Sequence, residues 1–474
     1  MHDFVQYVFY LLERGIRLAV PAVLVCAAVL TAVWGIARKR GRTFPWRKAA
    51  ALLMLVGWLM LTVFATLLRG EPGYREWNFH LFRAWREAWN QFALQAWLNV
   101  LLNIALFVPL GVLLPILSGK FRKWKQMLLA GLGVSLAIEF AQLATGQGMF
   151  DVDDLFTNVL GAMVGWSITS LILTVLARGN GWKKRCLGCL LIPAALACAF
   201  AAIGIGYAVK PYGNLPDAPA VAADLKDVQW KLDFAPEDVP ATAQVYQAGR
   251  LDKAAGENYG TQFAQQLGIT FPDVYYYDDL MIFADHSTGD FLHLNQRDGT
   301  WEYIIGRERT PTFDGAPQDL RAEDVLNTLL SWGITVPEGA QFTLDAPQAR
   351  ASAVASFTAN LVPAADRLAY GTLRCHLEYE DGQTRMDRIV NEMVDLTPCG
   401  EEQVLSPAQA VTELYRGRSF AGAVLARLDV TNIEICSCTL DWMADTKGFY
   451  QPVYRFELRT GGQGTTMDYV PALQ

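Results

Sequence analysis

The chain has 474 residues, of which 52% are hydrophobic and 18% are charged, and its formal net charge is −7. This length is enough for two or more domains. The charge is unevenly divided, with 21 Lys and Arg against 9 Asp and Glu up to Lys210, and 19 against 38 after it. We therefore expect a basic membrane region followed by an acidic soluble region, whose acidity argues against binding to nucleic acid.

The first region contains six apolar runs of the length that crosses a bilayer as a helix, roughly 20 residues. They cover residues 16–37, 49–68, 97–117, 126–144, 155–177 and 186–209. Residues 1–210 are therefore predicted to form an α-helical polytopic bundle with about six transmembrane helices. Arg38, Lys39 and Arg40 directly follow the first run, so we expect it to stay in the membrane as an anchor.

The short loops between these runs predict how the bundle is oriented. Loops 38–48, 120–125 and 178–185 are basic, whereas loop 145–154 carries only acidic charge. Lysine and arginine favour the cytoplasmic side of a membrane. We therefore expect a multi-pass protein of the cell membrane, with both termini and the acidic region on the extracytoplasmic side.

The segment 75–96, before the third run, has an amphipathic pattern that predicts a helix. Trp77, Leu81, Trp85, Trp89, Phe92 and Ala96 recur at helical spacing, with Arg83, Arg86, Glu87 and Asn90 on the opposite face. Such a helix lies on the outer leaflet, or it packs flat on the bundle through the same aromatic side chains. The pattern fits both interpretations equally.

Polar side chains interrupt the third to fifth runs near their predicted outer ends. Asn99 and Asn103 begin the third run, and Glu139 lies inside the fourth. A carboxylate within an apolar run is costly unless it faces a polar interior or takes part in function. We therefore predict one outward-facing pocket, formed by Asn103, Glu139, Gln142, Asp151, Asp153, Asp154 and Asn158.

Several of these polar residues also have structural interpretations. Asp151 is placed to cap the fifth helix, and Asp153 and Asp154 to complement the positively polarised start of that helix. Glu139 has no capping role, so its structural alternative is a hydrogen bond to an asparagine of the same set. The spacing Gly161-x3-Gly165 is typical of close helix packing.

The chemistry of the predicted pocket stays open. Carboxylate and amide oxygens suit magnesium or calcium, but the spacing is not that of an EF-hand loop, and we assign no cofactor. Proton transfer by Glu139 is an alternative, whereas nucleophilic catalysis by Ser135 lacks an obvious base. The sequence therefore does not decide whether the protein is an enzyme.

The pocket residues belong to three patterns that follow one another along the chain. They are Asn103-x3-Phe107-x-Pro109-x-Gly111, Ser135-x3-Glu139-x2-Gln142 and Phe150-Asp151-Val152-Asp153-Asp154-x3-Asn158-x2-Gly161. Over residues 96–177 the chain resembles the VanZ-like membrane family, which is named for a protein associated with low-level teicoplanin resistance. The resemblance implies a role in the cell envelope.

The chain departs from the family pattern at one place. The family usually carries an arginine in the turn before the Phe-Asp pair, where this chain has Gln147, Gly148 and Met149. If that arginine pairs with a carboxylate or an anionic ligand, its role is vacant or is supplied elsewhere, for which Arg69 and Arg75 are candidates.

The acidic region is predicted to be an α+β domain, residues 224–474, joined to the bundle by a Pro-, Gly- and Ala-rich linker, residues 211–223. Hairpins with Asp-Gly turns are expected at 291–305 and 375–390, each followed by a helix, at 320–332 and 405–415. The second helix opens with Ser406 as N-cap and Pro407 at its first position. The similar spacing of the two copies suggests a diverged tandem repeat, with units at about 265–347 and 348–474.

The acidic domain shows no phosphate-binding loop and no Ser/His/Asp set, and it resembles no family over its whole length. Its last strand, residues 449–458, resembles small extracytoplasmic regulatory domains of Gram-positive bacteria. An exterior location would permit disulfides, whose pairing the sequence does not choose, among Cys375, Cys399, Cys436 and Cys438.

Two functions of different classes fit these observations. In the first, the outward-facing pocket binds or modifies a membrane lipid or a lipid-linked wall precursor, with a link to glycopeptide (teicoplanin) resistance. In the second, the protein is a non-enzymatic sensor or scaffold, anchored in the membrane, whose exterior domain binds an envelope protein or a wall ligand.

Overall fold

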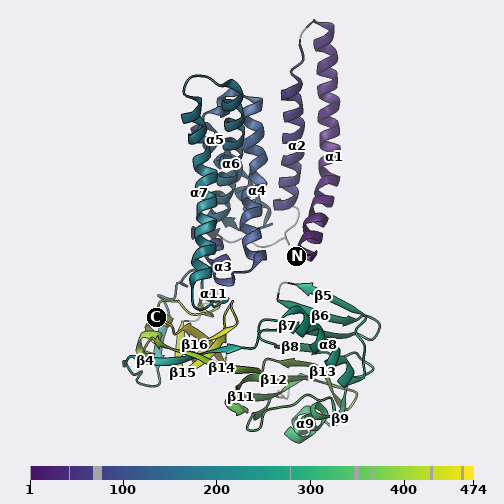
Figure 1. Cartoon of the computed structure of the whole chain (residues 1–474), viewed down its shortest axis with the longest axis vertical. Coiled ribbons are helices and arrows are strands. Elements are labelled where there is room, and N and C mark those ends of the chain that lie inside the picture. The colour runs from purple at the N-terminus through teal and green to yellow at the C-terminus, as the bar shows by residue number, and fades with distance from the viewer. Residues whose placement is uncertain are drawn as a thin grey trace. The chain divides into compact units, whose positions relative to one another are not determined.

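The computed structural model describes residues 2–41, 43–67, 77–277, 279–345, 352–364, 367–427, 431–460 and 464–474. The chain forms two compact units, His2–Ala222 and Ala223–Gln474. The first unit is helical and the second is built on a β-sheet (Figure 1). The expected fold class, a polytopic helical bundle followed by a mixed domain, is confirmed.

The helical unit contains the six predicted spans. Within the described residues, six helices are long and apolar enough to cross a membrane. All six begin before the apolar run that predicted them. They are α1 (His2–Lys39), α2 (Trp46–Leu67), α4 (Leu94–Leu117), α5 (Trp124–Thr145), α6 (Val152–Ala177) and α7 (Trp182–Val209).

Helices α4 and α6 pack closely because glycines let their backbones approach. A Cβ added at Gly161 would lie 1.9 Å from the carbonyl oxygen of Ile104, and one at Gly165 would lie 2.1 Å from that of Val108. A Cβ added at Gly111 of α4 would likewise lie 1.9 Å from the carbonyl oxygen of Ala162 in α6. The predicted packing role of the two α6 glycines is confirmed. The adjoining core contains Trp58, Phe107, Leu110, Met127, Ile138, Ala162 and Met163.

The helix predicted before α4 is shorter than its apolar stripe. It is α3 (Arg83–Gln91), and the first tryptophan of the stripe lies instead in β1 (Trp77–Asn78), which pairs in parallel with β2 (Phe150–Asp151). Phe82 and Phe92 have φ angles of 66° and 39°, so the backbone leaves the helical conformation at both ends of α3. The expectation of one continuous helix up to α4 is therefore wrong.

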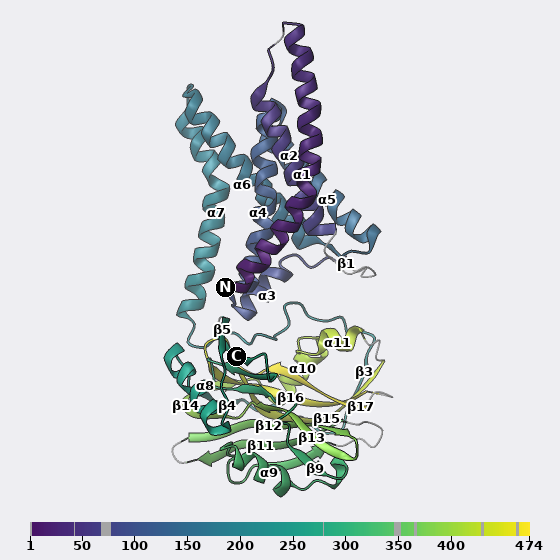
Figure 2. The same ribbon diagram turned by 90° about the vertical axis from the view of Figure 1, so that its right-hand side faces the viewer.

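Helix α3 packs on the bundle, at the end where α4 begins (Figure 2). Ala88 is 1% exposed. The ring of Trp85 lies 5.4 Å from that of Phe200 in α7, and the ring of Trp89 lies 6.2 Å from that of Tyr207. Of the two interpretations of the amphipathic pattern, the structure therefore shows the helix packed on the bundle.

The segment predicted as a linker is hydrogen-bonded to α3. The Asn90 side-chain amide donates to the carbonyl oxygen of Ala218 at 2.8 Å, and Arg86 Nη1 donates to that of Ala220 at 3.3 Å. Arg86 and Asn90 are four residues apart and share one face of α3. That polar face therefore holds the chain as it leaves α7.

The second unit is built on one sheet, which has 15 strands among the described residues. The main path is β3-β15-β16-β4-β14-β12-β13-β8-β7-β6-β5, and β17, β9 and β10–β11 pair beside it. The strands are β3 (Gln229–Leu232), β4 (Ala241–Ala248), β5 (Asp273–Tyr277), β6 (Leu280–Asp285), β7 (Asp290–Asn295), β8 (Trp301–Ile304), β9 (Thr312–Asp314), β10 (Gln341–Asp345), β11 (Ser352–Ala364), β12 (Arg367–Glu380), β13 (Gln383–Asn391), β14 (Val394–Val404), β15 (Asn432–Ala444), β16 (Phe449–Thr460) and β17 (Gly464–Pro471).

Both predicted hairpins and both predicted helices are present in this unit. The hairpins are β7–β8 and β12–β13, and in the second one Asp381 and Gly382 have φ angles of 55° and 83° at the turn. Ser406 caps α10 by accepting the Gln409 N–H at 3.2 Å, and Pro407 is its first residue, as expected. The helices are α8 (Lys253–Leu267), α9 (Ala322–Ser331), α10 (Pro407–Tyr415) and α11 (Gly422–Arg427).

The hydrophobic cores of the sheet are not divided at the predicted boundary between residues 347 and 348. One cluster contains Leu292 and Tyr303 of the first hairpin together with Leu373 and Met386 of the second. The tandem repeat stays a prediction. The four cysteines for which disulfides were considered, Cys375, Cys399, Cys436 and Cys438, are free in the structure.

Gly161→Ala is expected to destabilise the helical unit by at least about 1–3 kcal/mol, because the added methyl group has to displace a carbonyl oxygen of α4. Thermal unfolding of the full chain in detergent measures the effect. Gly188→Ala is the matched control, since nothing lies within 4 Å of a Cβ added there in α7. Equal unfolding temperatures for the two variants would contradict the packing described here.

Candidate functional site

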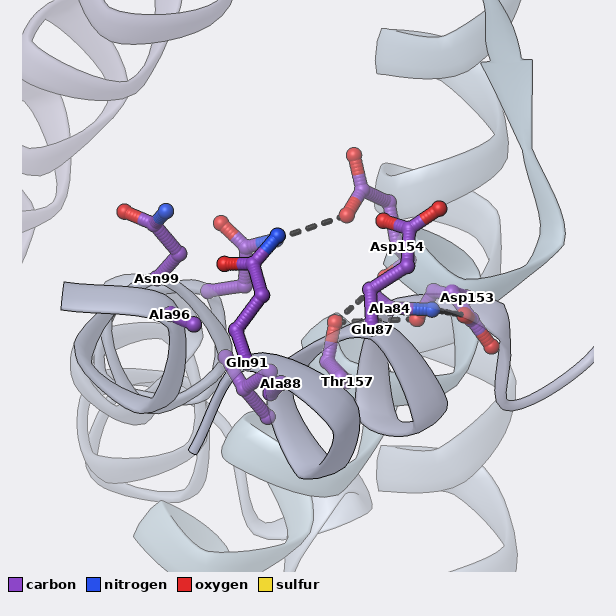
Figure 3. A pocket seen from close by; sticks show the side chains of 11 residues that line it. Ala84, Glu87, Ala88, Gln91, Ala96, Asn99, Asp153, Asp154 and Thr157 are labelled. Atoms are coloured by element: carbon purple, nitrogen blue, oxygen red, sulfur yellow. Dashed lines mark hydrogen bonds between the residues drawn. The ribbon is translucent and has the colours of Figure 1, made fainter. Parts of the chain in front are cut away.

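A cavity of about 210 Å³ lies where α3 meets the first turns of α4 and α6 (Figure 3). Its lining contains three carboxylates and three side-chain amides, with no Lys, Arg or His among the described residues. The side chains that line it are Ala84, Glu87, Ala88, Gln91, Ala96, Asn99, Val100, Asn103, Asp153, Asp154 and Thr157. The cavity is therefore polar and acidic.

Asp154 and Asn103 meet across the cavity. The Asn103 amide donates to Asp154 Oδ1 at 2.7 Å and joins α4 to α6. Asn99 lies four residues before Asn103, on the same face of α4, and it also lines the cavity. Asp154 makes no ion pair with any described residue. Two of the predicted pocket residues are thus brought together as expected.

Asp153 attaches α3 to α6. Its Oδ2 accepts the backbone N–H of Ala84 at 2.7 Å, and its Oδ1 accepts that of Phe82. These N–H groups lie at the start of α3, where a helix has donors without partners of its own and favours negative charge. Asp153 lines the cavity, but both of its oxygens already accept N–H groups of α3 and it is 1% exposed.

Asp151 and Glu139 support Asp153 from behind. Asp151 is the N-cap of α6, because its Oδ1 accepts the Asp153 N–H at 2.7 Å. Asn78 donates to both Asp151 oxygens at 3.1 Å. Glu139, 1% exposed, accepts the Asp151 backbone N–H at 3.0 Å. The predicted cap is confirmed. The expected hydrogen bond of Glu139 to Asn103 or Asn158 is wrong, because Glu139 accepts the Asp151 N–H, whereas the two amides donate to Asp154 and Ser135.

Two predicted pocket residues bond elsewhere in the bundle. The Asn158 amide donates to Ser135 Oγ at 3.0 Å, and this joins α6 to α5. Gln142 donates to the carbonyl oxygen of Thr66 at 3.2 Å, which joins α5 to α2. Neither side chain lines the cavity. Ser135 is completely buried, so it is not accessible as a nucleophile.

The seven predicted residues therefore separate into three groups. Asn103, Asp153 and Asp154 line the cavity, Glu139 and Asp151 support it, and Gln142 and Asn158 hold helices together.

Sequence reasoning missed Glu87 and Gln91 of α3, which line the cavity beside Asp154 (Figure 3). Glu87 belongs to the polar face of the amphipathic pattern, and Gln91 follows it by four residues on the same side of the helix. That pattern was the signal that could have identified both as candidate site residues. Glu87 is also paired with Arg83, whose Nε lies 2.8 Å from Glu87 Oε1. The arginines proposed as substitutes for the family arginine, Arg69 and Arg75, lie outside the described residues.

The cavity carboxylates do not form a compact metal-binding group. Within the described residues, the one group of three such side chains with ligand atoms within 4.8 Å of one another is Asp233, Glu434 and Cys436, in the β-rich unit. There Glu434 is already paired with Lys231 and Arg459. The arrangement at the cavity suits hydrogen bonding to a polar ligand.

Asp153→Ala is expected to release α3, because two backbone N–H groups lose their acceptor at a cost of about 2–4 kcal/mol. Hydrogen–deuterium exchange of the full chain in detergent should then be faster over residues 82–91. Asp217→Ala removes an exposed carboxylate of the same unit and should leave this exchange unchanged. Unchanged exchange in Asp153→Ala would refute the attachment.

Comparison with known proteins gives one informative match. The family model described as VanZ/LLP1 matches residues 49–174. A search of curated proteins finds no match. Among solved structures, an uncharacterized protein from Eubacterium rectale is 10% identical, and the match covers 51% of this chain and 86% of that chain. Its TM-score of 0.26 is too low to support an argument about the fold.

The family match extends from α2 to α6, so it begins earlier than the resemblance found over residues 96–177. It includes all seven predicted pocket residues and every residue that lines the cavity. The helical unit of this chain therefore contains a VanZ-like region, at residues 49–174.

Proposed function

We propose that this VanZ-like membrane protein acts in the cell envelope, where its cavity binds the polar head of a membrane lipid or of a lipid-linked wall precursor. The observation that carries the proposal is the cavity itself. It is lined by acidic and amide side chains from α3, α4 and α6, at one end of a bundle of membrane-spanning length. Polar groups placed in this way are costly unless they serve a ligand or a partner.

Exposed aromatic side chains support a position at the level of the lipid head groups. Trp77, Phe79 and Phe140 are 53%, 66% and 54% exposed. Their rings surround Phe150, at centroid distances of 5.2, 6.0 and 5.5 Å, and Phe150 directly precedes the cap residue Asp151. Tryptophan, which Trp77 contributes to this group, is enriched where a membrane meets water. The carboxylate network would then lie at this boundary.

The distribution of basic residues supports an extracytoplasmic position for the cavity. Lys120, Arg122 and Lys123 lie between α4 and α5, and Lys125 lies in the first turn of α5. All four are at the other end of α4 from Asn99 and Asn103. Basic residues favour the cytoplasmic side, so the cavity end would face outward. In this orientation the protein would meet lipid-linked wall precursors on the outer leaflet, which would be the basis of a link to teicoplanin resistance.

A sensor or scaffold role is the second candidate. It is favoured by the edge strand β5, which pairs only with β6 among the described strands and leaves Tyr275 and Tyr276 each 41% exposed. An exposed edge of this kind can accept a strand from a partner. The partner would be an envelope protein or a wall ligand.

Asp154→Asn and Asn103→Ala are expected to lower teicoplanin resistance of cells that express the chain, at equal protein levels, because both change the lining of the cavity. Lipids that copurify with the full chain, identified by mass spectrometry, should decrease in the same variants. Asp217→Asn is the matched control, since it makes the same change of charge outside the cavity.

Wild-type resistance and wild-type lipid content in both cavity variants would exclude a function of the cavity. A chain that ends at Ala222 separates the two candidates. The cavity function predicts that it keeps its activity, whereas loss of resistance with retained lipid would favour the sensor.

A further inference from the structure

The carboxylates of the cavity differ in how far their charge is compensated. Asp153 accepts two backbone N–H groups, and Glu87 pairs with Arg83 at 2.8 Å. Asp154 accepts one neutral amide, from Asn103, and meets no cation among the described residues. Asp154 is thus the carboxylate whose charge is least compensated, and it lies on the cavity wall.

This charge distribution selects between classes of head group. A phosphate placed here would face the uncompensated carboxylate with no Lys, Arg or His in the described lining. A phosphate and a carboxylate in the same cavity would repel each other strongly, because water is partly excluded there. An ammonium group has N–H donors and a positive charge, which suit carboxylate and amide oxygens. The amides of Gln91, Asn99 and Asn103 supply further acceptors around Asp154.

The size of the cavity fixes which part of a lipid it would hold. At about 210 Å³ it is smaller than the roughly 300–1,000 Å³ of sites that enclose a whole small molecule. It therefore suits one polar end of an amphiphile, whose hydrocarbon part would stay in the bilayer. The exposed Trp77, Phe79 and Phe140 support this depth.

We propose that the head group bound in this cavity carries an ammonium group, with Asp154 as its counter-ion. The inference rests on the proposed binding function and names the chemical class of its ligand. It predicts a preference for amine-bearing lipids or amino-sugar precursors over lipids whose head groups are purely anionic.

The test uses the full chain in nanodiscs that contain phosphatidylglycerol and phosphatidylethanolamine, two lipids that differ in the ammonium group. The lipids retained after transfer to detergent are measured by mass spectrometry. In the wild type, the ratio of retained phosphatidylethanolamine to retained phosphatidylglycerol should be about tenfold higher than in the nanodisc, as expected for one charge-assisted contact. Asp154→Asn should lose most of this enrichment, since it removes the charge and keeps an oxygen for Asn103.

Two further variants keep the test decisive. Glu87→Gln should reduce the enrichment less than Asp154→Asn does, because Glu87 is already paired, and Asp217→Asn should leave it unchanged.

Free ethanolamine serves as the water-soluble probe. Displacement of the lipid by ethanolamine at millimolar concentration would support recognition of the ammonium group itself, and its failure to compete would support the lipid as the source.

The outcomes separate this inference from the proposed function. Retention of both lipids in the ratio of the nanodisc, or a preference for phosphatidylglycerol, would overturn the ammonium assignment and leave lipid binding in place. Enrichment that persists in Asp154→Asn would overturn the role of Asp154. Retention of no lipid after the transfer to detergent would contradict the binding function on which the inference rests.

Discussion

The carboxylate of Asp153 is the constraint on which the cavity depends. It lies in the first turn of α6 and accepts two N–H groups at the start of α3. A single side chain thus satisfies donors of a second helix and positions that helix across the bundle. This attachment fixes the start of α3, the helix from which Glu87 and Gln91 line the cavity beside Asp154. Asp151 and Glu139 fix Asp153 in turn, so most of the acidic residues in this part of the chain build the site.

Gly161 and Gly165 of α6 determine how closely α6 approaches α4. Because a Cβ at Gly161 would lie 1.9 Å from a carbonyl oxygen of α4, the helices approach to backbone contact just beyond the cavity. This closeness brings Asn103 within 2.7 Å of Asp154. The three faces of α3 complete the arrangement, since one packs on the bundle, one lines the cavity, and one holds the segment after α7.

The sequence predicts those features that depend on residues close together in the chain. The six spans follow from the length of their apolar runs, and the caps at Asp151 and Ser406 follow from side chains next to a helix start. The contact of Asn78 with Asp151 joins residues 73 positions apart, and no local pattern indicates it. The ends of α3 depend on backbone angles at Phe82 and Phe92 that aromatic residues rarely adopt. Only three of the seven predicted pocket residues line the cavity, because contacts between residues far apart in the chain leave no local pattern.

The proposed function requires that the cavity end of the bundle face the outside of the cell. The most direct test places a single cysteine at Gln147, in a background that lacks the eight native cysteines. This cysteine is then labelled with a membrane-impermeant maleimide. Gln147 lies between α5 and α6, four residues before Asp151. A cysteine at Lys123, at the other end of α5, is the comparison. With the cavity end outside, intact cells are expected to label at position 147 and not at position 123. Labelling at position 147 only after the cells are permeabilised would contradict it.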